Sequence, residues 1–182
     1  MLGGDLFGKA VAEFVGTAFL LLAVIGSGIA ASRLSPHDTR LALLENAVAT
    51  GGALVAIILA VGPVSGAHLN PIVSLADAAF GGLRRTEVVV YLLAQLAGGA
   101  VGAVAANLIY GLAPVSVASH VRSGGNLWLS QAIASLGLLL VIFGVVHSRR
   151  GGVAPFGAAN NPSTYVDGIV VNFYRRSSMP RG

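Results

Sequence analysis

The chain has 182 residues, of which 55% are hydrophobic and only 10% are charged. Soluble domains carry about 25% charged residues because their surfaces face water, so a soluble globular enzyme is excluded. Disorder is excluded as well, since disordered chains are poor in apolar residues. The mean hydropathy of +0.81 and the 25 glycines instead indicate an all-α integral membrane protein, in which glycine lets helices approach closely.

The net charge of +4 and the isoelectric point near 10.1 raise the question of nucleic-acid binding. The basic residues, however, lie singly or in pairs between apolar runs, as loop charges do in membrane proteins, and they form no clustered patch. We therefore expect no nucleic-acid partner. The chain has no cysteine and its four histidines are scattered over different loops and helix ends, so neither a metal nor another cofactor is expected.

Four predominantly apolar stretches are long enough to cross a bilayer, which takes about 20 residues. They predict spans over residues 9–31, 41–61, 88–110 and 126–147. The second stretch stays uncharged beyond residue 61 but contains two prolines, Pro63 and Pro71. One helix cannot run through both, because proline removes a backbone donor and clashes with the preceding turn. We therefore expect a break after residue 61.

The loop charges predict the orientation of these spans. With the N-terminus inside, the inner side holds five basic residues (Lys9, Arg84, Arg85, Arg149 and Arg150) and the outer side three (Arg33, Arg40 and Arg122). Cytoplasmic loops carry the excess of Lys and Arg. The sequence thus predicts a multi-pass protein of the cell membrane with both termini in the cytoplasm.

The character of the chain changes after residue 150. Residues 151–182 contain Asn161-Pro162, an Arg-Arg pair and no apolar run of 20 residues, so they cannot span as they stand. We expect residues 1–150 to form the membrane domain and residues 151–182 to form a divergent, flexible cytoplasmic tail. The alternative is that this tail replaces membrane sequence that should have continued here.

An internal repeat links the first and fourth predicted spans. Residues 12–22 align without a gap with residues 130–140, so that Glu13 meets Gln131 and Thr17 meets Ser135 at an offset of 118 residues. Because three spans separate the starts of the two copies, the copies enter the membrane from opposite sides. Such an inverted-topology repeat places a binding or transport site near the bilayer midplane.

A short helix is predicted after the second span. Asn70 is a good N-cap, Pro71 suits the first helical turn, and Gly81-Gly82 end the helix after about Phe80. Ten residues rise only about 15 Å, half a bilayer, which indicates a re-entrant half-helix.

The lead-in to this half-helix, residues 62–69, is expected to be irregular and to leave backbone carbonyls unpaired. A membrane tolerates such carbonyls only where they line a wet cavity. The positive end of the half-helix repels protons and cations, while the Asn70 amide can donate to a passing solute. These features predict a pore for neutral, hydrogen-bonding molecules.

Three motifs carry a family resemblance over about residues 10–150. They are Ala12-Glu13-Phe14-Val15-Gly16-Thr17, Ser65-Gly66-Ala67-His68-Leu69-Asn70-Pro71-Ile72-Val73, and Ala94-Gln95-Leu96-Ala97-Gly98-Gly99-Ala100-Val101-Gly102-Ala103. Together they resemble the aquaporin and glycerol-facilitator (major intrinsic protein) family. The resemblance implies a passive channel for water or small neutral solutes, not an enzyme. It also implies six spans, two half-helices meeting at the midplane, and tetramers with one pore per subunit.

The resemblance also implies roles for individual residues. Asn70 and Pro71 match the signature of the first half-helix, and Ile72 replaces the family's alanine with a bulkier group. Glu13 matches a buried carboxylate that braces the re-entrant loop. His68 either lines the pore entrance or fixes the loop by hydrogen bonding. The pore and half-helix residues so implied are Gly66, Ala67, His68, Asn70, Pro71 and Ile72.

Thr50 falls where the family's second helix carries a selectivity side chain. Water-selective members usually have an aromatic residue there, and the small Thr50 implies a wider constriction. That resembles members that pass glycerol or metalloid hydroxides such as arsenite. The alternative is that Thr50 only packs against a neighbouring helix.

The second half of the family pattern is not expected in this chain. The repeat offset places a second Asn-Pro motif near position 188, beyond Gly182, and Asn161-Pro162 lies 27 residues too early with no arginine next. The sequence therefore predicts four spans and one half-helix, an incomplete aquaporin-like bundle. A non-conducting fragment or an accessory membrane subunit is the alternative function.

Three further features have simpler interpretations. Gly98 and Gly102 are expected to form a helix-packing face, because no strand precedes them as a dinucleotide site would require. Glu45 lies inside the second span, where it is either functional or faces water near the outer end. His68 with Asp77 is not expected to form a hydrolytic dyad, since no activated nucleophile accompanies the pair.

Overall fold

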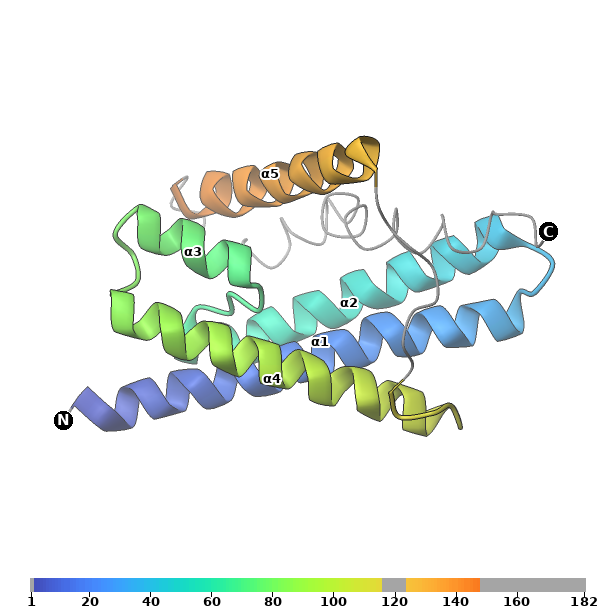
Figure 1. Cartoon of the computed structure of the whole chain (residues 1–182), viewed down its shortest axis with the longest axis horizontal. Helices are drawn as coiled ribbons and strands as arrows, with labels where there is room; N and C mark the ends of the chain where they lie inside the picture. Colours follow the sequence, from blue (N-terminus) through green and yellow to red (C-terminus); the bar gives the residue numbers. More distant parts are fainter. Residues whose placement is uncertain (1, 116–123, 148–182) are drawn as a thin grey trace.

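A computed structural model of the chain describes residues 2–115 and 124–147. The described residues form five helices and no strand: α1 (Leu2–Leu34), α2 (Thr39–Ser65), α3 (Pro71–Ala79), α4 (Arg85–Ile109) and α5 (Gly125–His147). Figure 1 shows α1, α2 and α4 running lengthwise beside one another, with the short α3 between α4 and α5. The all-α fold class predicted from composition is confirmed.

Four of the described helices are long and apolar enough to cross a membrane. Their apolar segments are Asp5–Leu34, Thr39–Ser65, Arg85–Ile109 and Gly125–Gly144. The chain is therefore a multi-pass membrane protein with the predicted number of spans in its described part, although the first three helices begin earlier or end later than expected. The expected boundary at residue 150, the tail 151–182 and Asn161-Pro162 lie outside the described residues.

The predicted break between the two prolines is present, but α2 ends four residues later than residue 61. Helix α2 continues through Pro63 to Ser65 and ends at Gly66, which has a left-handed backbone (φ 87°) and donates its N–H to the Gly62 carbonyl. Pro63 lies in the last turn, so its missing N–H costs a single helical hydrogen bond, which a membrane helix tolerates. The irregular segment is thus residues 66–70 and not 62–69.

The closest helix packing is between α1 and α4. A Cβ placed at Gly98 would collide with the Phe14 carbonyl oxygen, and one placed at Gly102 would collide with the Ala18 carbonyl oxygen. The two backbones therefore touch where both glycines lie, which confirms the expected packing face. On its other side α1 packs against α2 through an apolar cluster of Leu20, Val24, Leu54 and Leu69.

Helix α5 is attached differently from the others. Only 6% of its apolar segment is buried, against 39% for α1, and its main described neighbour is α3. The rings of Phe80 and Phe143 meet there edge to face, with centroids 5.1 Å apart. The packed part of the described molecule is therefore α1–α4, and this part positions the site.

Candidate functional site

The loop between α2 and α3 has an unusual backbone. Gly66, Ala67 and Leu69 all have positive φ angles, of 87°, 51° and 53°. For the two residues with a side chain this left-handed conformation costs about 1–3 kcal/mol each, and it persists only where the surroundings enforce it. The contacts of this loop therefore have to account for its shape.

Glu13 of α1 supplies most of those contacts. Its Oε1 accepts hydrogen bonds from Ser65 Oγ (2.7 Å) and from the His68 backbone N–H (2.9 Å). Its Oε2 accepts from the Leu69 N–H (2.7 Å) and from Gln95 Nε2 (2.8 Å). The side chain is fully buried, and a buried carboxylate is stable only when it is hydrogen-bonded in this way.

Two further residues tie α4 to the loop and the half-helix. Gln95 Nε2 also donates to Ser74 Oγ on α3 (2.9 Å), and the Tyr91 hydroxyl donates to the Ser65 carbonyl (2.7 Å). Gln95, Ser74 and Tyr91 are all buried. One connected polar network thus joins α1, the loop, α3 and α4 in the apolar interior.

His68 belongs to the same network. Its Nδ1 lies 3.2 Å from Ser74 Oγ, its Nε2 lies 3.8 Å from Asp77 Oδ2, and its ring meets Tyr91 edge to face at 5.4 Å. These contacts hold the ring against α3 and α4, as expected for the loop-fixing alternative. The Ser74 hydroxyl beside His68 is fully buried and accepts a hydrogen bond from Gln95, so it is not an exposed nucleophile.

Asn70 and Pro71 start the half-helix as their residue types dictate. Asn70 has an extended backbone, its Oδ1 accepts the Ile72 N–H (2.9 Å), and Pro71 occupies the first helical position. The helix then runs to Ala79 with Phe80 as its C-cap, which agrees with the predicted extent. Ile72 is exposed at 44%, at the start of this helix.

The loop presents both donors and acceptors that have no partner in the described part of the chain. No described donor reaches the carbonyl oxygens of Gly66, Ala67 and His68, and no described acceptor reaches the Asn70 Nδ2 hydrogens. The positive end of the α3 dipole lies at the same point. This arrangement can hydrogen-bond a neutral solute at both its donor and its acceptor groups, and it disfavours cations.

Thr50 lies on α2 between Asn46 and Leu54, one turn from each. Asn46 Oδ1 accepts from Ser27 Oγ of α1 (2.6 Å), so this face of α2 lies toward α1. Thr50 itself is 1% exposed, and its Oγ has no hydrogen-bond partner among the described residues. This burial agrees with packing between α1 and α2, which is the alternative to a role at the constriction.

A cluster of charged side chains joins the first turns of α1 to the start of α4, next to the loop that follows α3. Lys9 Nζ lies 3.3 Å from both Asp5 Oδ2 and Glu87 Oε1, and Arg84 Nε lies 3.1 Å from Glu87 Oε2. The hydrogen bonds to Glu87 raise the pKa of the Arg84 guanidinium above its ordinary value. The cluster therefore anchors the start of α4 to α1.

Sequence reasoning assigned no role to Gln95, Ser74, Ser65 or Tyr91, although all four complete the network around Glu13. A signal for Gln95 exists, since it is the single amide in the long uncharged run of α4 before Gly98. Such a residue inside a span usually faces a polar partner.

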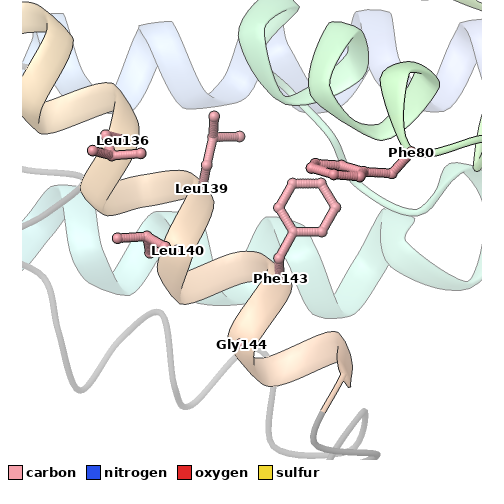
Figure 2. Close-up of a pocket in the computed structure, with 6 residues that line it drawn as sticks. All are labelled: Phe80, Leu136, Leu139, Leu140, Phe143 and Gly144. Atoms are coloured by element: carbon pink, nitrogen blue, oxygen red, sulfur yellow. The ribbon is translucent and has the colours of Figure 1, made fainter.

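A hollow among the described residues lies away from this loop and is apolar. Figure 2 shows this pocket of about 480 Å³, which lies between α5 and the end of α3. It is lined by Phe80, Leu136, Leu139, Leu140, Phe143 and Gly144. These side chains offer nothing that would bind a polar solute. No group of His, Asp and Glu in the described ranges could hold a metal ion.

Comparison with known proteins places these features in a family. The family model described as Major intrinsic protein matches residues 4–160, which runs past the boundary expected at residue 150. Over 149 residues the chain is 42% identical to "Aquaglyceroporin AqpS" of Rhizobium meliloti (strain 1021), covering 82% of this chain and 64% of that protein. It is 32% identical over 161 residues to "Aquaporin-5" of Ovis aries, covering 84% and 57%.

A plant relative shows the same partial coverage. The chain is 37% identical over 102 residues to "Probable aquaporin NIP7-1" of Arabidopsis thaliana, covering 56% of this chain and 36% of that protein. The chain thus spans at most 64% of the length of these three relatives.

Proposed function

The chain belongs to the major intrinsic protein family, whose members are channels and not enzymes, and from this membership we propose that it forms a wall of a passive transmembrane channel for water and small neutral solutes. The solutes we propose are glycerol-like polyols and, by the size of the Thr50 side chain, uncharged metalloid hydroxides such as arsenite. The similarity to the aquaglyceroporin of Rhizobium meliloti supports the polyol class.

The observation that carries the proposal is the loop at residues 66–70. The carbonyls of Gly66, Ala67 and His68, which no described donor reaches, can accept hydrogen bonds from a hydroxyl, and the Asn70 amide can donate one in return. The adjoining N-terminus of α3 repels protons and other cations. We propose that Gly66, Ala67, His68, Asn70, Pro71 and Ile72 form this part of the conduit, that Glu13 braces it, and that Thr50 sets its width.

The surroundings of the channel are part of the same proposal. By the distribution of Lys and Arg between the loops we place the chain in the cell membrane with its N-terminus, and the end of the bundle that carries Lys9 and Arg84, in the cytoplasm. The lipid bilayer is then its solvent, and the family suggests assembly as a homotetramer. We expect neither a nucleic acid nor a cofactor to take part.

Solute flux into proteoliposomes tests the proposal. The full chain is reconstituted, and swelling is followed by stopped-flow light scattering under a glycerol gradient and under an impermeant osmolyte. We expect glycerol and water permeabilities above those of empty liposomes, with no proton leak. Permeabilities equal to those of empty liposomes would show a non-conducting membrane protein, which is the alternative function. Chemical cross-linking in the same vesicles reports the oligomeric state.

A further inference from the structure

In the chain of hydrogen bonds from Glu13 through Gln95 and Ser74 to His68, the donor and the acceptor of each bond can be assigned. The Glu13 carboxylate can only accept, so the group of Gln95 that faces it must be the Nε2 amide with its two hydrogens. One of these hydrogens goes to Glu13 Oε2, and the other goes to Ser74 Oγ at 2.9 Å. Ser74 is thereby an acceptor toward α4.

The same reasoning assigns the donor and the acceptor of the hydrogen bond between Ser74 and His68. The Ser74 hydroxyl has one hydrogen of its own, and the remaining partner of its Oγ among the described residues is His68 Nδ1, at 3.2 Å. Ser74 therefore donates to Nδ1, which has to be the unprotonated nitrogen of the ring. A neutral imidazole then carries its proton on Nε2.

The surroundings of Nε2 agree with this assignment. Asp77 Oδ2 lies 3.8 Å from Nε2, so its negative charge attracts the Nε2 proton although the distance is too long for a direct hydrogen bond. Two further groups in the described part of the chain contact His68, namely Glu13, which accepts its backbone N–H, and the Tyr91 ring. Neither offers a partner that would favour a proton on Nδ1.

We propose that Ser74, Gln95 and Asp77 are positioning residues that hold the neutral form of the His68 ring in the tautomer protonated on Nε2, and that this single tautomer fixes the half-helix to the re-entrant loop. A proton on Nδ1 would leave the buried Ser74 hydroxyl without an acceptor, which is unfavourable at a fully buried position. The contact between loop and half-helix is thus conditional on where His68 carries its proton. The inference rests on the proposed function only where it concerns solute flux.

Nitrogen NMR of the full chain in lipid vesicles tests the tautomer directly. The protein is labelled with ¹⁵N-histidine, and the His68 signals are identified as those that His68→Gln removes from the spectrum of four histidines. At neutral pH we expect an unprotonated, pyridine-like shift for Nδ1 and a protonated, pyrrole-like shift for Nε2. A protonated Nδ1 in the neutral ring would overturn the proposal.

Two substitutions at one position separate the hydroxyl from the fold. In Ser74→Ala the donor to Nδ1 is lost, so we expect signals of both tautomers and a roughly threefold to tenfold loss of solute flux. Ser74→Thr keeps the hydroxyl and should retain one tautomer with flux within about twofold of the parent chain. Ser27→Ala, which removes a serine hydroxyl near Asn46 instead, is the matched control and should leave the His68 signals unchanged.

The outcomes distinguish this inference from the proposed function. A parent chain with no flux above that of empty liposomes refutes the channel, while the NMR result still decides the tautomer. If Ser74→Ala keeps a single Nε2-protonated tautomer, the positioning role is refuted. If Ser74→Thr loses the tautomer as Ser74→Ala does, the hydroxyl is not the deciding group and the proposal fails as well.

Discussion

At the scale of the residue, the site depends on one carboxylate. Glu13 accepts four hydrogen bonds from three parts of the chain, and each of its oxygens accepts two. Burying a charge in a membrane interior is energetically unfavourable, and removing one of its hydrogen-bond partners destabilises the protein. The stability of the loop should therefore respond to Glu13 more than to other acidic residues.

Replacement of Glu13 by glutamine tests this dependence. Glu13→Gln keeps the volume but puts an amide donor where two donors converge, so at least one hydrogen bond is lost and two donors face each other. We expect a loss of about 2–4 kcal/mol. In a chain of this length that lowers the Tm of the detergent-solubilised protein by roughly 5–15 °C.

Glu45 provides the matched control for this substitution. It also lies inside a span, but it is partly exposed, and its one described donor is the Ser35 hydroxyl, at 3.2 Å. Glu45→Gln retains an oxygen for that bond, so we expect a change in Tm of no more than about 2 °C. An equal decrease in Tm for Glu13→Gln and Glu45→Gln would show that the four hydrogen bonds of Glu13 do not stabilise the protein more than the Ser35 contact of Glu45 does.

The width of the conduit is a second property of a single residue. Thr50→Trp replaces a small side chain by an indole at the proposed constriction, and pore diameter governs selectivity, so we expect glycerol flux to fall roughly tenfold with a smaller effect on water. Val48→Trp, on the same helix but 67% exposed, is the control and should conduct as the parent chain does. Unchanged glycerol flux in a folded Thr50→Trp would assign Thr50 to packing between α1 and α2.

At the scale of the element, the contact between α1 and α4 sets the distance between Glu13 and Gln95. Two glycines one turn apart, Gly98 and Gly102, let the α4 backbone touch carbonyl oxygens of α1. Any side chain at these positions would separate the helices. Because Gln95 lies on the same face of α4, separation would also lengthen its bond to Glu13.

Adjacent glycines in α4 allow a controlled test of this contact. Gly98→Ala puts a methyl group against the Phe14 carbonyl oxygen, and such overpacking costs about 1–3 kcal/mol. At Gly99 the same methyl group would lie 3.8 Å from Leu21 and Thr17, which is ordinary contact, and the better helix propensity of alanine should make Gly99→Ala neutral or stabilising by up to about 1 kcal/mol. Thermal unfolding of both variants in the same detergent tests this difference. A similar Tm for Gly98→Ala and Gly99→Ala would contradict the close contact between Gly98 and the Phe14 carbonyl oxygen.

The elements show how far sequence reasoning reaches. The start of α3 was predictable because an N-cap asparagine and a proline at the first helical position act locally, as Asn70 and Pro71 do. The end of α2 was not predictable in this way. Proline usually interrupts a helix, but Pro63 lies inside the last turn of α2, and the helix ends only at Gly66, which has a left-handed backbone. For the candidate site, the motif at residues 65–73 predicted where the re-entrant loop lies. The partners of Glu13 could not be predicted, because they depend on helix packing that no local sequence pattern encodes.

At the scale of the whole molecule, the bilayer surrounds the helices, and the single tryptophan can report its position. Trp128 lies near the start of the α5 span, Gly125–Gly144, and is 74% exposed. Tryptophan is enriched at the membrane interface, where an apolar ring with a polar N–H is favoured. Four residues into a span corresponds to a shallow depth.

Fluorescence quenching in vesicles checks that depth. We expect lipids brominated near the head group to quench Trp128 more strongly than lipids brominated near the chain end, and aqueous iodide to quench it less than free tryptophan. Trp128→Phe removes the signal and serves as the blank. Quenching by iodide as strong as for free tryptophan, with none by either lipid, would place the start of α5 outside the membrane.

The hydrogen bonds of Glu13 also impose an order in time. Its four partners follow it along the chain by 52, 55, 56 and 82 residues. At about 5–20 residues per second, Gln95 is synthesised roughly 4–16 s after Glu13. During that interval the Glu13 carboxylate lacks at least the Gln95 donor, and the lipid interior cannot solvate the oxygen left without it. Helix α1 is therefore synthesised before α4 but acquires its full set of Glu13 hydrogen bonds only once α4 packs against it.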